Sequence, residues 1–156
     1  MGRYETSNNS TTTVASKTST PMNAAENNQM WYGMYDKQKK FTTNTDVMQS
    51  SMIWGSQYDA MLNWIQAGGK NIDTTDKGNH SGSPTITGGT PTDIINNIYD
   101  LEGNLYEWTL EANGSSARSA RGGSYLAAYP IYNRTSSFST YYTYNDLGSR
   151  LSIYIK

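Results

Sequence analysis

The sequence predicts a single domain of the α+β class, and three observations support that prediction. The chain has 156 residues, a usual length for one domain with a buried core. Apolar residues between positions 56 and 67 recur with the period of an α-helix. From Tyr106 onward, short alternating segments are separated by turn residues, as in antiparallel strands. We therefore expect residues 1–156 to form one domain with one main helix, several short antiparallel strands and long loops.

The core of this domain must be built largely from aromatic side chains. Valine occurs only at positions 14 and 47 and phenylalanine only at positions 41 and 138, whereas there are 4 tryptophans and 13 tyrosines. Low aliphatic content combined with high net charge is typical of disordered chains, but the net charge here is −1. A buried ring contributes about 150–250 Å² and, in Trp and Tyr, brings a polar group that needs a partner. We expect a compact, loop-rich fold.

The first half of the chain contains the main helix. Residues 6–28 are rich in Ser, Thr and Asn, which is typical of a loop or a poorly ordered arm. Residues 29–41 can form a short helix. The main helix is expected to start with Ser56 as its N-cap and to end at Gly68 and Gly69. Its buried stripe would be Tyr58, Met61, Leu62 and Ile65, with Trp64 at the edge.

Turn residues dominate the second half. Residues 70–92 form a long polar loop, and loops of that length in compact domains are usually functional or mobile. Residues 93–100 form either a helical turn or a short strand. Gly103 and Asn104 tolerate positive φ, so they predict a tight turn before a strand that starts with Glu107 and Trp108.

Two further segments complete the expected strands. Gly122 and Gly123 permit a close backbone approach before a strand that holds Ser124 and Tyr125. The last strand alternates two sets of side chains on opposite faces. These sets are Leu151, Ile153 and Ile155 on one face and Ser152, Tyr154 and Lys156 on the other.

The composition disfavours several functional classes. A nucleic-acid-binding protein normally carries a basic stripe, but the only dense basic run here lies between Lys37 and Lys40. No apolar run is long enough for a membrane span, and no segment has the pattern of a signal peptide. Cysteine is absent, and His80 is the only histidine, in a Gly/Ser/Asn loop where we expect it to be solvated. We expect no nucleic-acid partner and no direct membrane insertion.

Three motifs in order resemble the formylglycine-generating-enzyme (sulfatase-modifying factor) family, a branch of the C-type-lectin-like fold. The first runs through Tyr99, Asp100, Gly103, Asn104, Glu107 and Trp108; the second is Arg121, Gly122, Gly123 and Ser124; the third is Gly148 and Arg150, with Ser149 in place of the usual aromatic residue. The resemblance implies a C-type-lectin-like fold over most of residues 2–156.

The oxidase activity of that family is not expected in this chain. Its oxidising members use two cysteines after the Gly-Gly-Ser motif to bind copper, and the matching positions here are about Ala127 and Tyr132. Neither side chain replaces a soft thiolate ligand for Cu(I). The sequence therefore predicts no enzyme activity, and a residual oxidase is the least favoured alternative.

The same branch of the fold also includes the target proteins of diversity-generating retroelements in phages and bacteria, in which a C-terminal stretch varies. Residues 124–147 match that role because Tyr, Ser, Thr and Asn are also the residues that antibody loops use for recognition. The predicted ligand-binding residues are Tyr129, Ile131, Tyr132, Asn133, Phe138, Tyr141, Tyr142, Tyr144 and Asn145. The resemblance implies a protein or cell-surface ligand and an extracellular, cell-surface or phage-virion location.

Two alternatives to a ligand-binding role remain for the tyrosines of residues 124–147 and for the whole chain. The tyrosines can cover an aromatic core instead, and Tyr125 and Tyr154, which lie beside the motifs, are expected to be framework residues. Because adjacent strand residues face opposite ways, Tyr141 and Tyr142 cannot both be exposed if they lie in a strand. The alternative function is that of a structural module in a larger surface or phage assembly.

A structural calcium site is predicted at the turn of the first motif. Asp100, the carbonyl groups of Gly103 and Leu105, and Glu107 lie within eight residues, and oxygen ligands on a bent backbone suit Ca²⁺. The resemblance implies calcium at the matching positions. The alternative is that Glu107 accepts backbone hydrogen bonds and Asp100 caps the turn.

Overall fold

The computed structural model describes residues 1–9, 12–14, 19–22, 30–41 and 46–156, and it has the α+β class that the sequence predicts. The helices are α1 (Trp31–Lys39) and α2 (Gly55–Ala67). The strands are β1 (Ser7–Asn9), β2 (Thr12–Val14), β3 (Thr20–Pro21), β4 (Met48–Met52), β5 (Ile94–Ile95), β6 (Ile98–Tyr99), β7 (Tyr106–Asn113), β8 (Ala117–Arg121), β9 (Arg134–Ser139), β10 (Leu147–Ser149) and β11 (Leu151–Ile155).

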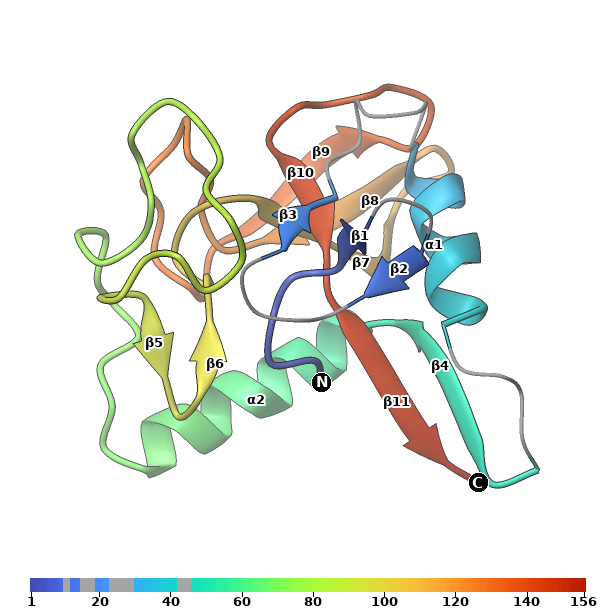
Figure 1. Cartoon of the computed structure of the whole chain (residues 1–156), viewed down its shortest axis with the longest axis horizontal. Helices are drawn as coiled ribbons and strands as arrows, with labels where there is room; N and C mark the ends of the chain where they lie inside the picture. Colours follow the sequence, from blue (N-terminus) through green and yellow to red (C-terminus); the bar gives the residue numbers. More distant parts are fainter. Residues whose placement is uncertain (10–11, 15–18, 23–29, 42–45) are drawn as a thin grey trace.

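A four-stranded sheet in the order β10-β7-β8-β9 forms the centre of the domain (Figure 1). Its β10 runs parallel to β7, and the other neighbours are antiparallel. Strands β11 and β4 form a separate antiparallel ribbon that extends away from the centre, with the C-terminus at its end (Figure 1). Strands β5 and β6 form a hairpin, and β2-β1-β3 form a small sheet.

Helix α2 confirms the predicted stripe but not the predicted cap. Tyr58 and its three stripe partners are buried, and Trp64 is 55% exposed. The N-cap is Trp54 rather than Ser56, because the Gln57 side chain accepts a hydrogen bond from the Trp54 N–H at 3.0 Å. At the other end Gly69 has φ +74°, and the next amide donates to the Ile65 carbonyl at 3.3 Å, which closes a Schellman motif.

Several segments differ from their sequence-based predictions. The described parts of residues 6–28 form β1, β2 and β3, whereas positions 10–11, 15–18 and 23–28 lie outside the described residues. For residues 93–100 the structure decides between the two alternatives in favour of strand, since they hold the β5–β6 hairpin, whose turn uses Asn96 and Asn97 at positive φ. Ser124 and Tyr125 lie in no regular strand, since only an isolated bridge joins Ser124 to Ala127.

Two core clusters hold the elements together. One lies between α1 and the central sheet and contains Trp31 and Trp108, packed with Met22, Met34, Met52, Tyr106, Ala120 and Leu147. The other joins the α2 stripe to Ile53, Ile72, Ile95, Leu101 and Ile131. The prediction of an aromatic core is therefore confirmed in part, because Trp54 and Trp64 are exposed.

Candidate functional site

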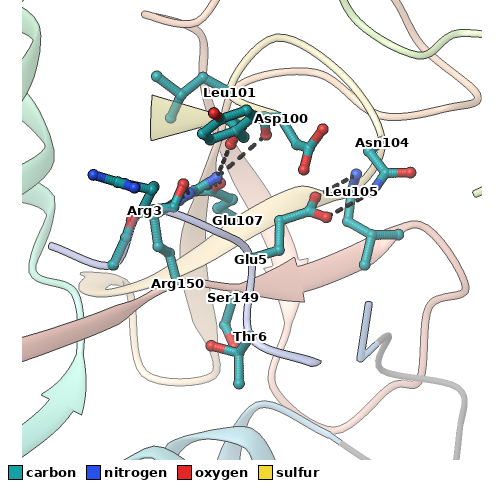
Figure 2. Close-up of polar contacts among 12 residues, drawn as sticks. Arg3, Glu5, Thr6, Asp100, Leu101, Asn104, Leu105, Glu107, Ser149 and Arg150 are labelled. Atoms are coloured by element: carbon teal, nitrogen blue, oxygen red, sulfur yellow. Dashed lines mark hydrogen bonds and ion pairs between the residues drawn. The ribbon is translucent and has the colours of Figure 1, made fainter. Parts of the chain in front are cut away.

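Arg150, between β10 and β11, is the centre of a buried polar network (Figure 2). Its guanidinium donates to the Glu107 carboxylate through both Nε and Nη2, with the Nε contact at 2.7 Å. It also donates to the carbonyls of Arg3 at 3.0 Å and of Tyr99 at 2.8 Å. One side chain thus joins the N-terminal segment, β6, β7 and the last strands.

Glu5 makes the second link between the N-terminus and the motif turn (Figure 2). Its carboxylate accepts the Asn104 Nδ2–H at 2.6 Å and the Leu105 N–H at 3.0 Å. Asn104 has φ +68°, as the turn prediction requires, and its Oδ1 accepts the Thr85 N–H at 2.8 Å. Gly103 does not have positive φ; it is needed because a Cβ there would contact the backbone of Asn79. The turn therefore binds the loop 70–92, through Thr85, as well as the N-terminal segment, through Glu5.

Two further carboxylates bind the backbone around this turn. Asp93 accepts the N–H groups of Leu101, Glu102 and Gly103, at 3.0–3.3 Å. Glu102 accepts the Lys77 N–H at 2.6 Å and so holds the long loop. Asp93 and Glu102, rather than Glu107, therefore accept the backbone hydrogen bonds around this turn.

The network contains more buried acids than buried bases. Among the described residues, Glu5, Asp93, Asp100, Glu102 and Glu107 are each at most 1% exposed, whereas the buried cations are Arg150 and Arg121. Arg121 forms an ion pair with Asp59 instead. Burial raises the pKa of Glu107, and Arg150 offsets part of that rise. Burial also raises the pKa of Glu5 well above its usual value, with Asp100 adding to the rise.

Asp100 makes the domain more stable at mildly acidic pH. Burial raises its pKa to about 6 in the folded state, although the Gly88 N–H, at 2.5 Å, and Arg150 oppose the rise. The folded state therefore binds the Asp100 proton more tightly than the unfolded state does. This contribution is complete below the unfolded pKa of about 4 and is lost as the pH rises through about 6. In chelator-containing buffer, we expect the free energy of unfolding to be about 1 kcal/mol higher at pH 5 than at pH 7.5 from this group.

Asp100→Asn tests this contribution, because it removes the titrating group and because Asn tolerates the φ of +57° at this position. Urea unfolding of both proteins at the two pH values measures the effect. The variant is expected to lose the part of the difference that Asp100 contributes, about 1 kcal/mol, while Glu5 and Glu107 keep theirs. An Asp100→Asn protein with the same pH dependence as the parent chain would show that Asp100 is not the titrating group.

Two of the four predicted calcium ligands have other partners in the structure. Glu107 pairs with Arg150, and Asp100 accepts the Gly88 N–H. One oxygen each of Asp100 and Glu107 is buried without a hydrogen-bond partner. Within the described residues, no group of three or more Asp, Glu or His side chains is arranged to hold a metal ion. The guanidinium already supplies positive charge to this cluster of oxygens, and calcium stays a prediction.

Gly122 and Gly123 attach the predicted variable segment to this framework. Gly122 has φ +75°. A Cβ at Gly123 would overlap the Glu102 carbonyl and would lie 2.9 Å from the Ala127 carbonyl and 3.0 Å from the Tyr129 N–H. The prediction of a close backbone approach is confirmed. The start of the segment therefore lies directly on the motif turn.

Five of the nine predicted ligand-binding residues present exposed side chains. Tyr129 and Tyr132 are 47% and 46% exposed, and Tyr141 and Tyr142 are 61% and 66% exposed. Asn145 is exposed as well. Tyr141 and Tyr142 both point outward because they follow β9 in a turn and not in a strand. The β9–β10 connection lies at the edge of the domain opposite the C-terminus (Figure 1).

The other four predicted residues belong to the framework. Ile131 is fully buried in the α2 core, so its assignment to the ligand surface is wrong. The Phe138 ring packs on Tyr106 and Tyr144, with centroids 5.6 Å and 5.0 Å away, and Tyr144 also contacts Trp108. Asn133 donates to the Gly122 carbonyl at 3.2 Å and to Thr135 at 3.0 Å. Tyr125 is buried, as predicted for a framework residue.

The loop 70–92 supports the exposed segment from one side. The Tyr132 hydroxyl donates to Asp73 at 3.1 Å, and this hydrogen bond raises the pKa of Tyr132. The amide of Gly82 donates to the Tyr125 carbonyl at 2.9 Å. His80 is largely covered, with Nδ1 2.9 Å from the Ser124 carbonyl oxygen, so the prediction of a solvated histidine is wrong. The polar loop therefore helps to shape the exposed surface.

Sequence reasoning missed two residues that extend this surface. Tyr32 on α1 is 49% exposed, and its ring centroid lies 6.4 Å from that of Tyr141. Leu126, at the start of the segment, is 63% exposed. Tyr32 is far from the segment in sequence, so only the fold brings it there. Leu126 lies inside the segment, but an apolar leucine beside Tyr125 is more typical of a core position than of an exposed one.

Comparison with known proteins adds no assignment. The chain matches no protein-family model, no curated protein and no solved structure at a significant level. Within the part of the chain that the structure describes, no helix is long and apolar enough to span a membrane.

Proposed function

We propose that this protein is a non-enzymatic ligand-binding domain that displays a variable-type surface on a C-type-lectin-like fold. The observation that carries the proposal is the outward orientation of the four tyrosines at positions 129, 132, 141 and 142. Tyr side chains provide large contact area at low entropic cost, as in antibody loops. The segment that holds them begins and ends on a framework fixed by buried charges. The ligand would be a protein or a cell-surface molecule, met in an extracellular or virion setting.

The arrangement separates binding residues from framework residues within one segment. Exposed tyrosines alternate with anchors such as the buried Ile131 and the half-buried Phe138. A surface residue without special contacts usually changes stability by less than about 0.5 kcal/mol when it is replaced. The exposed positions can therefore vary while the fold persists, which is what a diversified binding protein requires.

The structural-module alternative has one observation in its favour. Phe138 and Tyr144 pack with Trp108 and Tyr106, so part of the aromatic content of the segment serves the core. This packing does not account for Tyr141 and Tyr142, which lie mostly in solvent. Calcium at the motif turn is a separate proposal, and the binding function does not depend on it.

A display experiment tests whether this surface can act as a binding site. A library randomised at Tyr129, Tyr132, Tyr141, Tyr142 and Asn145 would be selected against lysozyme as a defined protein target. We expect folded binders, because these positions combine exposure with a rigid support. The matched control randomises five exposed positions on α2, namely Ser56, Ala60, Asn63, Trp64 and Gln66.

The outcomes separate the two functions. Binders from the tyrosine library and few from the α2 library support recognition by residues 124–147. Variants of the tyrosine library that fail to fold would show that these side chains are part of the core. Folded variants that yield no more binders than the control library would also argue against the proposal.

A further inference from the structure

The two-stranded β4–β11 ribbon exposes apolar side chains that the domain does not cover. Ile155 is 81% exposed, Ile153 is 47% exposed, and Met48, opposite Ile155 on β4, is 40% exposed. Val47, next to Met48, is 60% exposed. The sequence alternation had placed Leu151, Ile153 and Ile155 on one face, but only Leu151 is buried. An isolated pair of strands is marginally stable in water, so this ribbon lacks the usual support at its outer end.

The backbone of β11 has an open edge on the side away from β4. Lys156 N–H donates to the Val47 carbonyl at 2.9 Å, and Ile53 N–H donates to the Arg150 carbonyl at 3.2 Å. Hydrogen-bonded pairs alternate along an antiparallel ladder, so the backbone groups of residues 151, 153 and 155 point away from β4. The Leu151 carbonyl accepts the Gly2 N–H at 2.6 Å. Among the described residues, no strand continues along this edge past Leu151.

Past the N-terminal residues that lie beside Leu151 and Ile153, none of the described residues blocks this edge against another strand. Residues 151–155 contain no proline and no charged residue, and their register with β4 is continuous, without a bulge. Natural proteins usually block such edges with charge, proline, a bulge or a covering loop. An open edge with exposed Ile side chains is therefore a surface for strand addition.

We infer that the occupant of this edge is β11 of a second copy of the chain, in an antiparallel two-fold pair centred on Tyr154. In that register Ile153 forms a hydrogen-bonded pair with Ile155 of the second copy, and the reverse pair forms by symmetry. The pairing uses only the backbone groups of residues 153 and 155 and leaves the Gly2 contact intact. The four isoleucines then share one face, where β-branched cross-strand pairs are favourable.

Charge also fits a second copy. Lys156 falls opposite Ser152 of the second copy, so no like charges meet in the paired stretch. The same patch serves both chains, as a two-fold interface requires. In Figure 1 the ribbon lies at the edge opposite the β9–β10 connection, so pairing leaves Tyr141 and Tyr142 of both copies open. A dimer of this kind presents two binding surfaces and gains affinity through bivalency.

Sedimentation equilibrium across protein concentrations from about 1 μM to about 1 mM tests the pairing. We expect a monomer–dimer equilibrium for the parent chain and a monomer for Ile153→Lys/Ile155→Lys, since the lysines place like charges opposite one another. The control is Ile94→Lys, which changes a 40%-exposed isoleucine on the β5–β6 hairpin and should leave the dimer unchanged. Circular dichroism shows whether each variant is folded.

A cysteine variant tests the register. Tyr154 faces itself in a pair without backbone hydrogen bonds, where Cα atoms are about 4.5 Å apart, within the range that a disulfide bridges. The chain has no cysteine, so Tyr154→Cys can form only an intermolecular disulfide. We expect most chains to cross-link under mild oxidation, and Ile94→Cys to do so much less. A parent chain that stays monomeric throughout, or that forms only large aggregates, would overturn the inference.

Discussion

Replacing Arg150 with methionine is expected to destabilise the domain by about 3–5 kcal/mol, a large part of the roughly 5–15 kcal/mol that stabilises a typical domain. Arg150 is fully buried, and its guanidinium bonds to Glu107 and to four carbonyl groups. Burial alone would lower the pKa of Arg150, but Glu107 and Glu5 more than offset this and raise it, so the guanidinium stays charged. Methionine fills a similar volume but leaves the carboxylates of Glu5, Asp100 and Glu107 without a buried cation.

Two further variants separate charge from packing. Arg134→Met removes a half-exposed arginine that pairs with Asp59 and Glu111, and it should cost no more than about 1 kcal/mol. The double variant Arg150→Met/Glu107→Gln removes the Glu107 charge, which the single variant leaves buried without a cation. It should therefore recover part of the lost unfolding free energy. Urea unfolding of the four proteins measures these differences. A loss below about 1 kcal/mol for Arg150→Met would mean that the network does not hold the fold together.

Replacing Gly123 with alanine is expected to destabilise the domain by about 3 kcal/mol and to displace the start of the exposed segment. The added Cβ would overlap the carbonyl of Glu102, with the Ala127 carbonyl and the Tyr129 N–H close by. These are backbone atoms, so no side chain can rotate away to make room. Either the motif turn or the loop that carries Tyr129 has to shift.

Gly68→Ala is the matched control for this effect. Gly68 has φ −78°, and the nearest atom, the Ile65 carbonyl oxygen, would lie 3.4 Å from the new Cβ, which is ordinary contact. We expect the control to change the unfolding free energy by less than about 1 kcal/mol. Thermal unfolding measures both variants, and nuclear magnetic resonance shifts of the Tyr129 and Tyr132 rings report the displacement. Equal stability of the two variants would mean that Gly123 is not required where the exposed segment lies against the motif turn.

Local patterns in the sequence were sufficient for the elements that depend on neighbouring residues. The spacing from Tyr58 to Ile65 predicted the buried face of α2, and the glycine pair predicted its end. The cap was wrong because Gln57 reaches back to Trp54, a contact that the preference for serine at N-caps does not show. The Asn96-Asn97 pair is a hairpin signal that could have decided between turn and strand for residues 93–100.

Contacts between distant residues could not be predicted. Glu5 binds a turn that lies 99 residues away, and Arg150 pairs with Glu107 across 43 residues. Arg150 and Glu107 belong to motifs that the sequence showed, but their pairing depends on the topology that brings β10 beside β7. The exposure of individual tyrosines has the same origin. Tyr142 and Tyr144 are two residues apart, yet Tyr142 lies in solvent and Tyr144 packs on Trp108.

Sequencing the gene and its surrounding DNA in many isolates of the source population tests whether residues 124–147 are diversified. The proposed function predicts a nearby reverse transcriptase gene and a near-copy of the DNA that encodes residues 122–156, with the two copies differing mainly at adenines. Differences should fall on the codons of Tyr129, Tyr132, Tyr141, Tyr142 and Asn145 and should spare the buried Ile131. Isolates with an invariant segment and no near-copy would contradict the claim, and the tyrosine surface would then be a fixed contact or a covering for the core.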